Sequence, residues 1–292
     1  MQVLLQCVVS GILLGGLYAI IGIGLSIVFG IMKLTNIAHG TLMILSSFFI
    51  MVIINNFIPN VFLAILVAIV LMVIVAFLFQ KFLVNAVIDK GDEPALLVTF
   101  GVSICVQNIL EIFFASNPQS LSSTNKFAGG NIIETKLFSV PGSYFIDFVV
   151  AVIVIIALAL IMKKTDIGRA IRATSDNKRA AELMGVNTKV MFVVTMGIAM
   201  ATATIAGYLV GSTFVFYSYS GSGYLIIAFG VVVIGGMGSL FGTLIGGILL
   251  GLVQLLGANF FGTGWQALTG YVFMLIILAI LPNGILGSGK RS

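Results

Sequence analysis

The chain has 292 residues, of which 60% are hydrophobic and only 8% are charged, with a mean hydropathy of +1.23 and a net charge of +5. Soluble domains carry about a quarter charged residues, so this composition excludes an ordinary water-soluble fold. It indicates a single membrane domain over residues 1–292 whose surroundings are the lipid bilayer. In such a protein the basic residues set orientation in the membrane, and they do not indicate a nucleic-acid partner.

Apolar stretches follow one another almost from end to end. A membrane-spanning helix needs about 20 predominantly apolar residues. Because many stretches follow the first, the first is a span and not a cleaved signal peptide. The second stretch is short, which suits a tilted or half-membrane helix. The stretches are 8–30, 41–56, 60–82, 94–116, 143–163, 189–214, 225–256 and 265–282.

The 225–256 stretch is too long for one span, and the run Gly235-Gly236-Met237-Gly238-Ser239 interrupts it. We therefore predict two segments that meet at a break. Irregular backbone at membrane depth is tolerated only against protein or a wet cavity, so the break should face the inside of the assembly. The predicted fold class is all-α, a polytopic transmembrane helix bundle of eight or nine spans. Candidates for the translocation path at the break are Gly235, Gly236, Gly238 and Ser239.

The basic residues predict the orientation of the spans. Half of the fourteen lie in the connection 163–189, which should therefore be cytoplasmic. Counting spans backward places the loop 117–142 and the N-terminus outside. Counting forward, the split of the long stretch places Lys290 and Arg291 inside, whereas an unsplit stretch would place them outside. The prediction is a multi-pass membrane protein whose connection 163–189 is cytoplasmic.

Glycine spacing predicts how the helices pack. Several pairs of glycines lie four residues apart, an arrangement that lets helix backbones approach closely in lipid. A weak internal repeat relates the segment 18–30 to the segment 224–236, as in transporters that are built from repeated halves. The pairs are Gly11 with Gly15, Gly207 with Gly211, Gly242 with Gly246, and Gly247 with Gly251.

The connection 163–189 is the least membrane-like part of the chain. We expect two short helices there, with Asp166 and Asp176 as the N-terminal caps. Gly185 and Asn187 should stop the second helix. Its small apolar side would consist of Ala181, Leu183 and Met184. A rigid elbow of this kind can transmit force from a soluble partner to the spans on either side.

The sequence Arg179-Ala180-Ala181-x3-Gly185 resembles the E-A-A-x3-G coupling signature of ABC importer permeases. Arg179 replaces the glutamate of that signature, and the I-x-L-P that follows it is missing. Both departures suit the branch of the family that transports branched-chain amino acids. The order of three blocks along the chain also resembles the LivH-type permeases of that branch. These blocks are 15–40, 170–185 and 228–247.

This resemblance implies a non-catalytic permease of the bacterial plasma (inner) membrane that works with several partners. They are a second, homologous permease that completes a heterodimer, two cytoplasmic ATP-binding subunits, and an extracytoplasmic solute-binding protein. Leucine, isoleucine and valine are the implied substrates, while close relatives carry urea or short amides. The residues implied to couple the chain to the ATPases are Arg172, Asp176, Arg179, Ala180, Ala181, Glu182, Leu183, Met184 and Gly185.

Polar residues inside the predicted spans are further candidates for the translocation path. Gln107 and Glu111 share a helix face, with Asn108 beside them. Charge inside a bilayer is costly and indicates function, but Glu111 is also close enough to the outer end to anchor at the headgroups. Both interpretations stay open. Asn36 and His39 form a bend after the first span, where a structural role is favoured over a role in protonation.

Two other classes of function are weaker. An ion-coupled secondary transporter needs buried acids, and Glu111 is the only acid that we expect within a span. A membrane enzyme needs clustered catalytic groups, and Cys7 and Cys105 show no metal spacing. The run Gly284-x4-Gly289-Lys290 lacks the Ser or Thr and the helix of a phosphate-binding loop. We therefore predict no catalytic residue, metal site or cofactor, and expect the driving energy to come from a partner.

Overall fold

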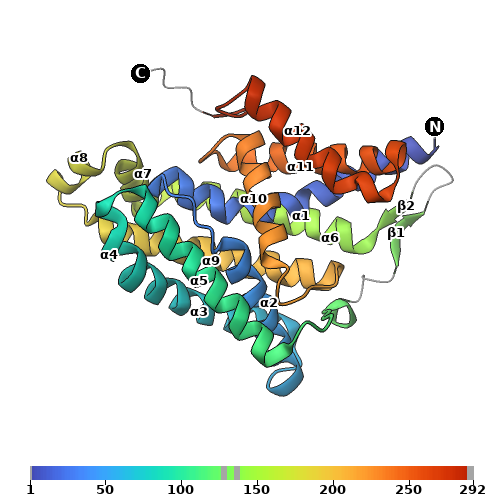
Figure 1. Cartoon of the computed structure of the whole chain (residues 1–292), viewed down its shortest axis with the longest axis horizontal. Helices are drawn as coiled ribbons and strands as arrows, with labels where there is room; N and C mark the ends of the chain where they lie inside the picture. Colours follow the sequence, from blue (N-terminus) through green and yellow to red (C-terminus); the bar gives the residue numbers. More distant parts are fainter. Residues whose placement is uncertain (1, 126–129, 135–138, 288–292) are drawn as a thin grey trace.

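The computed structural model describes residues 2–125, 130–134 and 139–287, drawn in Figure 1. In this part of the chain, eight helices are long and apolar enough to cross a membrane, and a ninth apolar helix, α10, is shorter. The predicted helical bundle of eight or nine spans is therefore confirmed. The main helices are α1 (Gln2–Met32), α2 (His39–Asn56), α3 (Val61–Leu78), α5 (Asp92–Phe114), α6 (Gly142–Lys164), α9 (Thr188–Thr213), α10 (Gly221–Gly235), α11 (Leu240–Phe261) and α12 (Gln266–Ile280).

Short elements connect or extend these helices. Helix α3 continues almost without interruption through a π-helical turn, so this span is longer than the sequence predicts. An antiparallel hairpin, β1 and β2, lies in the loop before α6 and was not predicted. The short elements are η1 (Phe79–Val84), α4 (Asn85–Val87), η2 (Ile88–Lys90), η3 (Ser122–Thr124), β1 (Asn131–Glu134), β2 (Ser139–Pro141), α7 (Asp166–Asp176), α8 (Lys178–Leu183) and η4 (Thr263–Trp265).

The break in the long apolar stretch is confirmed. Helix α10 ends at Gly235 and α11 begins at Leu240. The backbone between them turns through Gly236 and Gly238, whose φ angles of 102° and 83° are ones that side chains disfavour. Ser239 then caps α11, because its Oγ accepts a hydrogen bond from the Gly242 N–H at 3.0 Å.

The long axis of the molecule joins two different ends. The elbow end carries α7 and α8, and the hairpin end carries β1, β2 and the start of α1 (Figure 1). The Ser175 hydroxyl donates to the Gly30 carbonyl at 2.6 Å, so α1 finishes at the elbow end. The Leu286 N–H donates to the Gly235 carbonyl at 3.1 Å, so the last described segment lies there too. Gly289, Lys290 and Arg291 lie outside the described residues.

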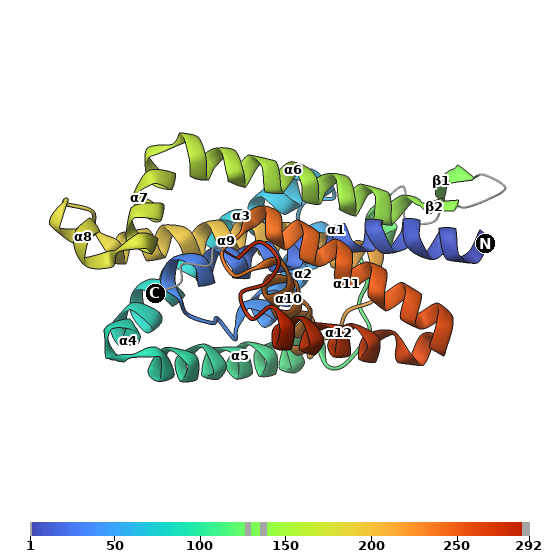
Figure 2. The ribbon, with the colours of Figure 1, turned by 90° about the horizontal axis from the view of Figure 1, so that it is seen from above.

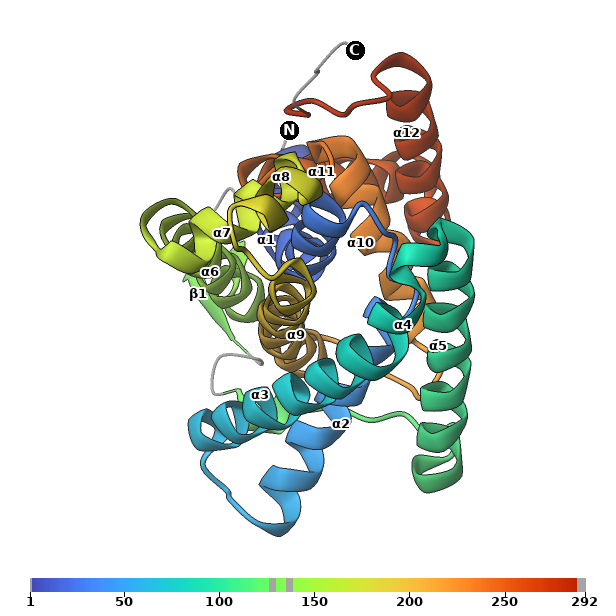
Figure 3. The same ribbon diagram turned by 90° about the vertical axis from the view of Figure 1, so that its left-hand side faces the viewer.

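Helix α1 is the centre of the bundle. Figures 2 and 3 show it surrounded by α6, α9, α10 and α11, with α3, α5 and α12 on the periphery. It packs on α11 through the predicted glycine pairs. A Cβ added to Gly15 would lie 2.4 Å from the Cα of Ile248, and one added to Gly251 would lie 2.5 Å from the Gly11 carbonyl oxygen. The backbones are therefore in direct contact, which gains dispersion energy that side chains would prevent.

Helices α2 and α10 both begin inside the bundle. His39, the first residue of α2, bonds through Nε2 to the Ile21 carbonyl near the middle of α1, at 3.1 Å. Gly221, the first residue of α10, lies directly against Thr41, since an added Cβ would be 2.6 Å from the Thr41 Cα. The segment 214–220 brings the chain inward from the end of α9 to this point. The sequence predicts a tilted or half-membrane helix here, and α2, with 18 residues, is long and apolar enough to cross a membrane.

Candidate functional site

The elbow consists of α7 and α8, and residues just before each helix cap it. The Thr165 side chain accepts from the Gly168 N–H, and the Asn177 side chain accepts from the Ala180 N–H, each at 3.0 Å. The predicted caps, Asp166 and Asp176, are wrong: they are the first and last residues of α7. A cap needs the extended backbone that Thr165 and Asn177 adopt. Asp166 instead forms an ion pair with an arginine one turn later.

Helix α8 ends two residues before Gly185, which the sequence predicts as its stop. This glycine has a φ of 85°, and the next N–H, of Val186, donates back to the Ala181 carbonyl at 3.0 Å. The pattern is that of a left-handed glycine terminating a helix. Asn187 does not stop α8. Its side chain accepts from the Val190 N–H at 3.2 Å and so caps the start of α9.

The apolar residues of α8 divide into two groups. Ala181 is buried, whereas Leu183 and Met184 are each 84% exposed and project beyond the bundle. Two adjacent large apolar side chains left uncovered at the tip of a protein indicate a contact with another molecule. The other coupling candidates on the elbow, among them Asp176, Arg179 and Ala180, are also exposed.

Polar contacts tie the elbow to several spans. Arg172 donates to the Met162 carbonyl at the end of α6, and Thr188 donates to Glu182 at 2.6 Å. Asp89, in the turn after α3, pairs with both Lys178 and Lys189, at 2.6 and 3.2 Å. Hydrogen bonds and ion pairs therefore connect the elbow to α6, α9 and the end of the α3 span, in addition to the hydrogen bond with α1.

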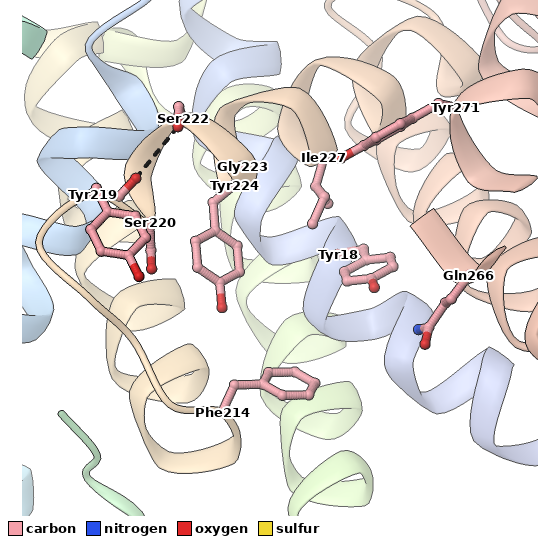
Figure 4. Close-up of a pocket in the computed structure, with 10 residues that line it drawn as sticks. All are labelled: Tyr18, Phe214, Tyr219, Ser220, Ser222, Gly223, Tyr224, Ile227, Gln266 and Tyr271. Atoms are coloured by element: carbon pink, nitrogen blue, oxygen red, sulfur yellow. Dashed lines mark hydrogen bonds between the residues drawn. The ribbon is translucent and has the colours of Figure 1, made fainter. Parts of the chain in front are cut away.

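A pocket of about 470 Å³ lies between α1, α10 and α12, and Figure 4 shows the residues that line it. One wall comes from the middle of α1, and another comes from the segment 214–220 with the internal start of α10. The start of α12 closes the third side. The lining residues are Tyr18, Phe214, Tyr219, Ser220, Ser222, Gly223, Tyr224, Ile227, Gln266 and Tyr271.

The pocket is neutral, aromatic and partly polar. None of its lining residues carries a charged side chain. Tyr18 is fixed in place, because its hydroxyl donates to Gln254 Oε1 at 2.6 Å, and both side chains are buried. The Ser222 hydroxyl donates to the Tyr219 carbonyl at 3.4 Å, shown as a dashed line in Figure 4. Aromatic walls with a few hydroxyl and amide groups suit a small solute that has both an apolar and a polar part.

The predicted path residues of the first bend are buried, and they support the backbone. Asn36 Oδ1 accepts from the Ala38 N–H at 3.1 Å, which closes the turn. His39 is wholly buried and packs against Gly24. Neither residue lines the pocket. Their contacts agree with the structural role that the sequence favours.

The remaining path candidates lie in two other places. Gln107, Asn108 and Glu111 follow one another along the second half of α5, where Asn108 and Glu111 are exposed. Glu111 accepts from the Ser116 hydroxyl at 3.1 Å. The break residues Gly235, Gly236, Gly238 and Ser239 lie at the elbow end, with Gly238 against Gly30. None of these lines the pocket, and their role in translocation stays a prediction.

Sequence reasoning missed the pocket and one buried acid. Tyr219, Tyr224 and Tyr271 all line the pocket, and none of them was a candidate in the sequence. The internal repeat could have indicated the pocket, because the matching first residues of the repeat, Tyr18 and Tyr224, both line it. The expectation that Glu111 is the only acid in a span is wrong. Asp147, on α6, is fully buried and accepts from the Thr213 hydroxyl at 2.8 Å.

Comparison with known proteins identifies the family. Residues 7–281 match the family described as branched-chain amino acid transport system / permease component. The high-affinity branched-chain amino acid transport system permease protein LivH of Salmonella typhimurium is 29% identical over 97% of this chain and 95% of its own. LivH of Escherichia coli K12, at 28%, and BraD of Pseudomonas aeruginosa, at 29%, have the same coverage.

Among solved structures, PsaBC from Streptococcus pneumoniae in complex with Fab aligns with 97% of this chain and 93% of its own, with a TM-score of 0.47 and 16% identity. That similarity is too low to support an argument. The family match covers the described helices from the first turns of α1 to the end of α12. The chain therefore belongs to the branched-chain amino acid transport system permease family and is a multi-pass protein of the inner membrane.

Proposed function

We propose that this chain is the membrane-spanning permease subunit of an ATP-driven importer that translocates leucine, isoleucine and valine by alternating access. The observation that carries the proposal is the family match over residues 7–281. The named relatives are high-affinity branched-chain amino acid permeases that this chain covers almost completely. The neutral aromatic pocket supports the same substrates, because it offers apolar surface to the side chain and hydroxyl or amide groups to the polar end.

The elbow is proposed as the docking site for the ATP-binding subunits. Three observations support this role: the exposed Leu183 and Met184, the Arg179-Ala180-Ala181-x3-Gly185 signature, and the bonds from the elbow to several spans. The excess of basic residues in the connection 163–189 favours the cytoplasmic side, where ATP is available. Partner ATPases would bury the two apolar side chains and push on the spans through the elbow.

The pocket is proposed as part of the solute path on the opposite side of the membrane. An opening toward the hairpin end would face an extracytoplasmic binding protein that delivers the solute. A second, homologous permease would complete the path as the other half of a heterodimer. The exposed flanks of the peripheral helices offer surface for such a partner as well as for lipid.

Reconstitution tests this proposal. The chain, a second permease and candidate ATP-binding subunits are placed in proteoliposomes with ATP inside and the binding protein outside, and uptake of radiolabelled leucine is measured. We expect uptake that requires ATP and that isoleucine and valine inhibit. Uptake of urea or acetamide in place of leucine would assign the chain to the other substrates. Leucine uptake by the chain alone under an ion gradient, without ATP, would show a secondary transporter.

A further inference from the structure

A second cavity, of about 450 Å³, lies at the elbow end and is separate from the pocket described above. We refer to it as the α3–α9 cleft, because the last turns of the α3 span form one wall and the start of α9 forms the other. It is lined by Phe77, Lys81, Asn85, Ala86, Asn187, Lys189, Val190 and Val193.

The cleft changes from polar to apolar along its length. Lys81, Asn85 and Lys189 line it toward the elbow, and Phe77 and Val193 line it about one helical turn deeper along their helices. Further in, the two helices close on each other: a Cβ added to Gly197 would lie 3.7 Å from the Val73 side chain. The outer flank of α3 on both sides of this point is apolar and exposed, including Val70 and Ile74. The apolar part of the cleft therefore continues onto a surface that faces acyl chains.

The polar part of the cleft carries an excess of positive charge. Lys189 pairs with Asp89, but Asp89 also pairs with Lys178, so one carboxylate serves two ammonium groups. Lys81 lies over the rings of Phe77 and Phe82, with Nζ 5.0 and 5.4 Å from their centroids. Among the described residues, no carboxylate lies within ion-pair distance of Lys81. An anionic ligand would therefore meet uncompensated charge at the mouth of the cleft.

The two walls of the cleft are joined by a chain of side-chain hydrogen bonds. The π-helical turn η1 places Gln80 on the buried side and Lys81 on the exposed side. Gln80 Nε2 donates to Asn85 Oδ1 at 2.9 Å, and Asn85 Nδ2 donates to the Lys189 carbonyl at 3.3 Å. Asn85 thus connects the two walls, and the cleft is present without a ligand.

We infer that the α3–α9 cleft binds one anionic glycerophospholipid from the leaflet at the elbow end. The headgroup phosphate would lie between the ammonium groups of Lys81 and Lys189, and the first acyl carbons would lie on Phe77 and Val193. Basic pockets between transmembrane helices on the cytoplasmic side attract acidic headgroups, and long lysine side chains reach from apolar surface to such groups. The amphipathic shape of the cleft favours a lipid over a soluble anion.

Native mass spectrometry of the delipidated full-length chain tests this inference. The protein is titrated with phosphatidylglycerol, with phosphatidylcholine and with inorganic phosphate. We expect phosphatidylglycerol to bind at least about fivefold more tightly than phosphatidylcholine. Lys81→Gln should weaken phosphatidylglycerol binding about fivefold, as expected for one lysine near the membrane surface, and Lys81→Arg should retain it. The matched control is Lys163→Gln, an exposed lysine at the same end but outside the cleft, which should bind as the unmodified chain does.

A second variant changes the shape of the α3–α9 cleft and leaves its charge unchanged. Val193→Trp fills the apolar floor and should weaken both phospholipids without a change in charge. Three results would each overturn the inference: equal affinity for the two phospholipids, an equal loss in Lys163→Gln and Lys81→Gln, or competition by inorganic phosphate as effective as that of phosphatidylglycerol. The last result would identify a site for free anions. Unchanged binding in both Lys81→Gln and Val193→Trp would place the lipid elsewhere.

Discussion

Helices α1 and α11 meet along glycines whose backbones leave no space for a methyl group, whereas the elbow contacts the bundle through a few buried residues of α7, hydrogen bonds and ion pairs. The glycines at the first contact, Gly11, Gly15, Gly247 and Gly251, are all buried. At the second, Leu183 and Met184 remain almost fully exposed. Substitutions in the α1–α11 contact should therefore unfold the chain. Substitutions at the exposed tip of the elbow should leave the chain folded and only weaken its contact with a partner.

The largest effect is expected from Gly15→Leu. A side chain at this position would meet the backbone of α11 at Gly247 and Ile248, which cannot move without separating the helices. We expect a loss of more than about 3 kcal/mol, beyond ordinary overpacking, and little monodisperse protein by size-exclusion chromatography. The matched control is Gly101→Leu on α5, where nothing lies within 4 Å of an added Cβ. An equal loss of protein in the control would remove the contrast between the two regions.

The double variant Leu183→Glu, Met184→Glu tests the other side of the comparison. Burial of each side chain by a partner should contribute about 1.5–3 kcal/mol, so co-purification with the ATP-binding subunits should fall more than tenfold. The melting temperature of the isolated chain should not change, because both side chains are already exposed. The swap Leu183→Met, Met184→Leu keeps the apolar surface and should keep the partners. Full ATPase binding by the charged variant would refute the docking assignment.

Gly223→Trp tests whether the solute passes through the pocket. Nothing lies within 4 Å of a Cβ added to Gly223, so the large ring can enter the pocket without disturbing the backbone. We expect leucine uptake to fall about tenfold while ATPase co-purification is unchanged. Gly223→Ala, which leaves the pocket open, serves as the reference. Normal uptake by the tryptophan variant would show that solute passes elsewhere.

The smallest effect concerns the cap of α8. Asn177→Ala removes the acceptor for the Ala180 N–H and should destabilise this short helix by about 1 kcal/mol. Hydrogen exchange of the elbow amides measures the change. Asp176→Ala is the control, since the Asp176 side chain does not cap α8. Faster exchange in the Asp176 variant than in the Asn177 variant would reinstate the cap that the sequence predicts.

The sequence predicts the elements whose signal is local. The glycines from Gly235 to Gly238 interrupt a long apolar stretch, and the break occurs there. Glycines four residues apart predicted close packing, and α1 and α11 confirm it. The polar connection between α6 and α9 predicted two short helices, although its caps were misplaced because Thr165 and Asn177 compete with the neighbouring aspartates.

Features that depend on tertiary contacts could not be predicted. The pocket joins Tyr18, Tyr224 and Tyr271, which are far apart in the sequence and resemble interfacial tyrosines when each is considered alone. Asp147 stands in the predicted span 143–163 and was overlooked, whereas its partner Thr213, 66 residues away, could not be predicted. The β1–β2 hairpin is too short for alternation of apolar and polar residues to reveal it.

Helix α1 runs without interruption from the hairpin end to the elbow end, and this continuity has a mechanical consequence. The Gly30 carbonyl holds Ser175 of the elbow, and Tyr18, twelve residues earlier on the same rod, forms a wall of the pocket. At about 1.5 Å per residue the two points are about 18 Å apart along a single rigid body. A tilt imposed at one point would displace the other, so in the proposed importer α1 would transmit the nucleotide cycle of a partner directly to the solute.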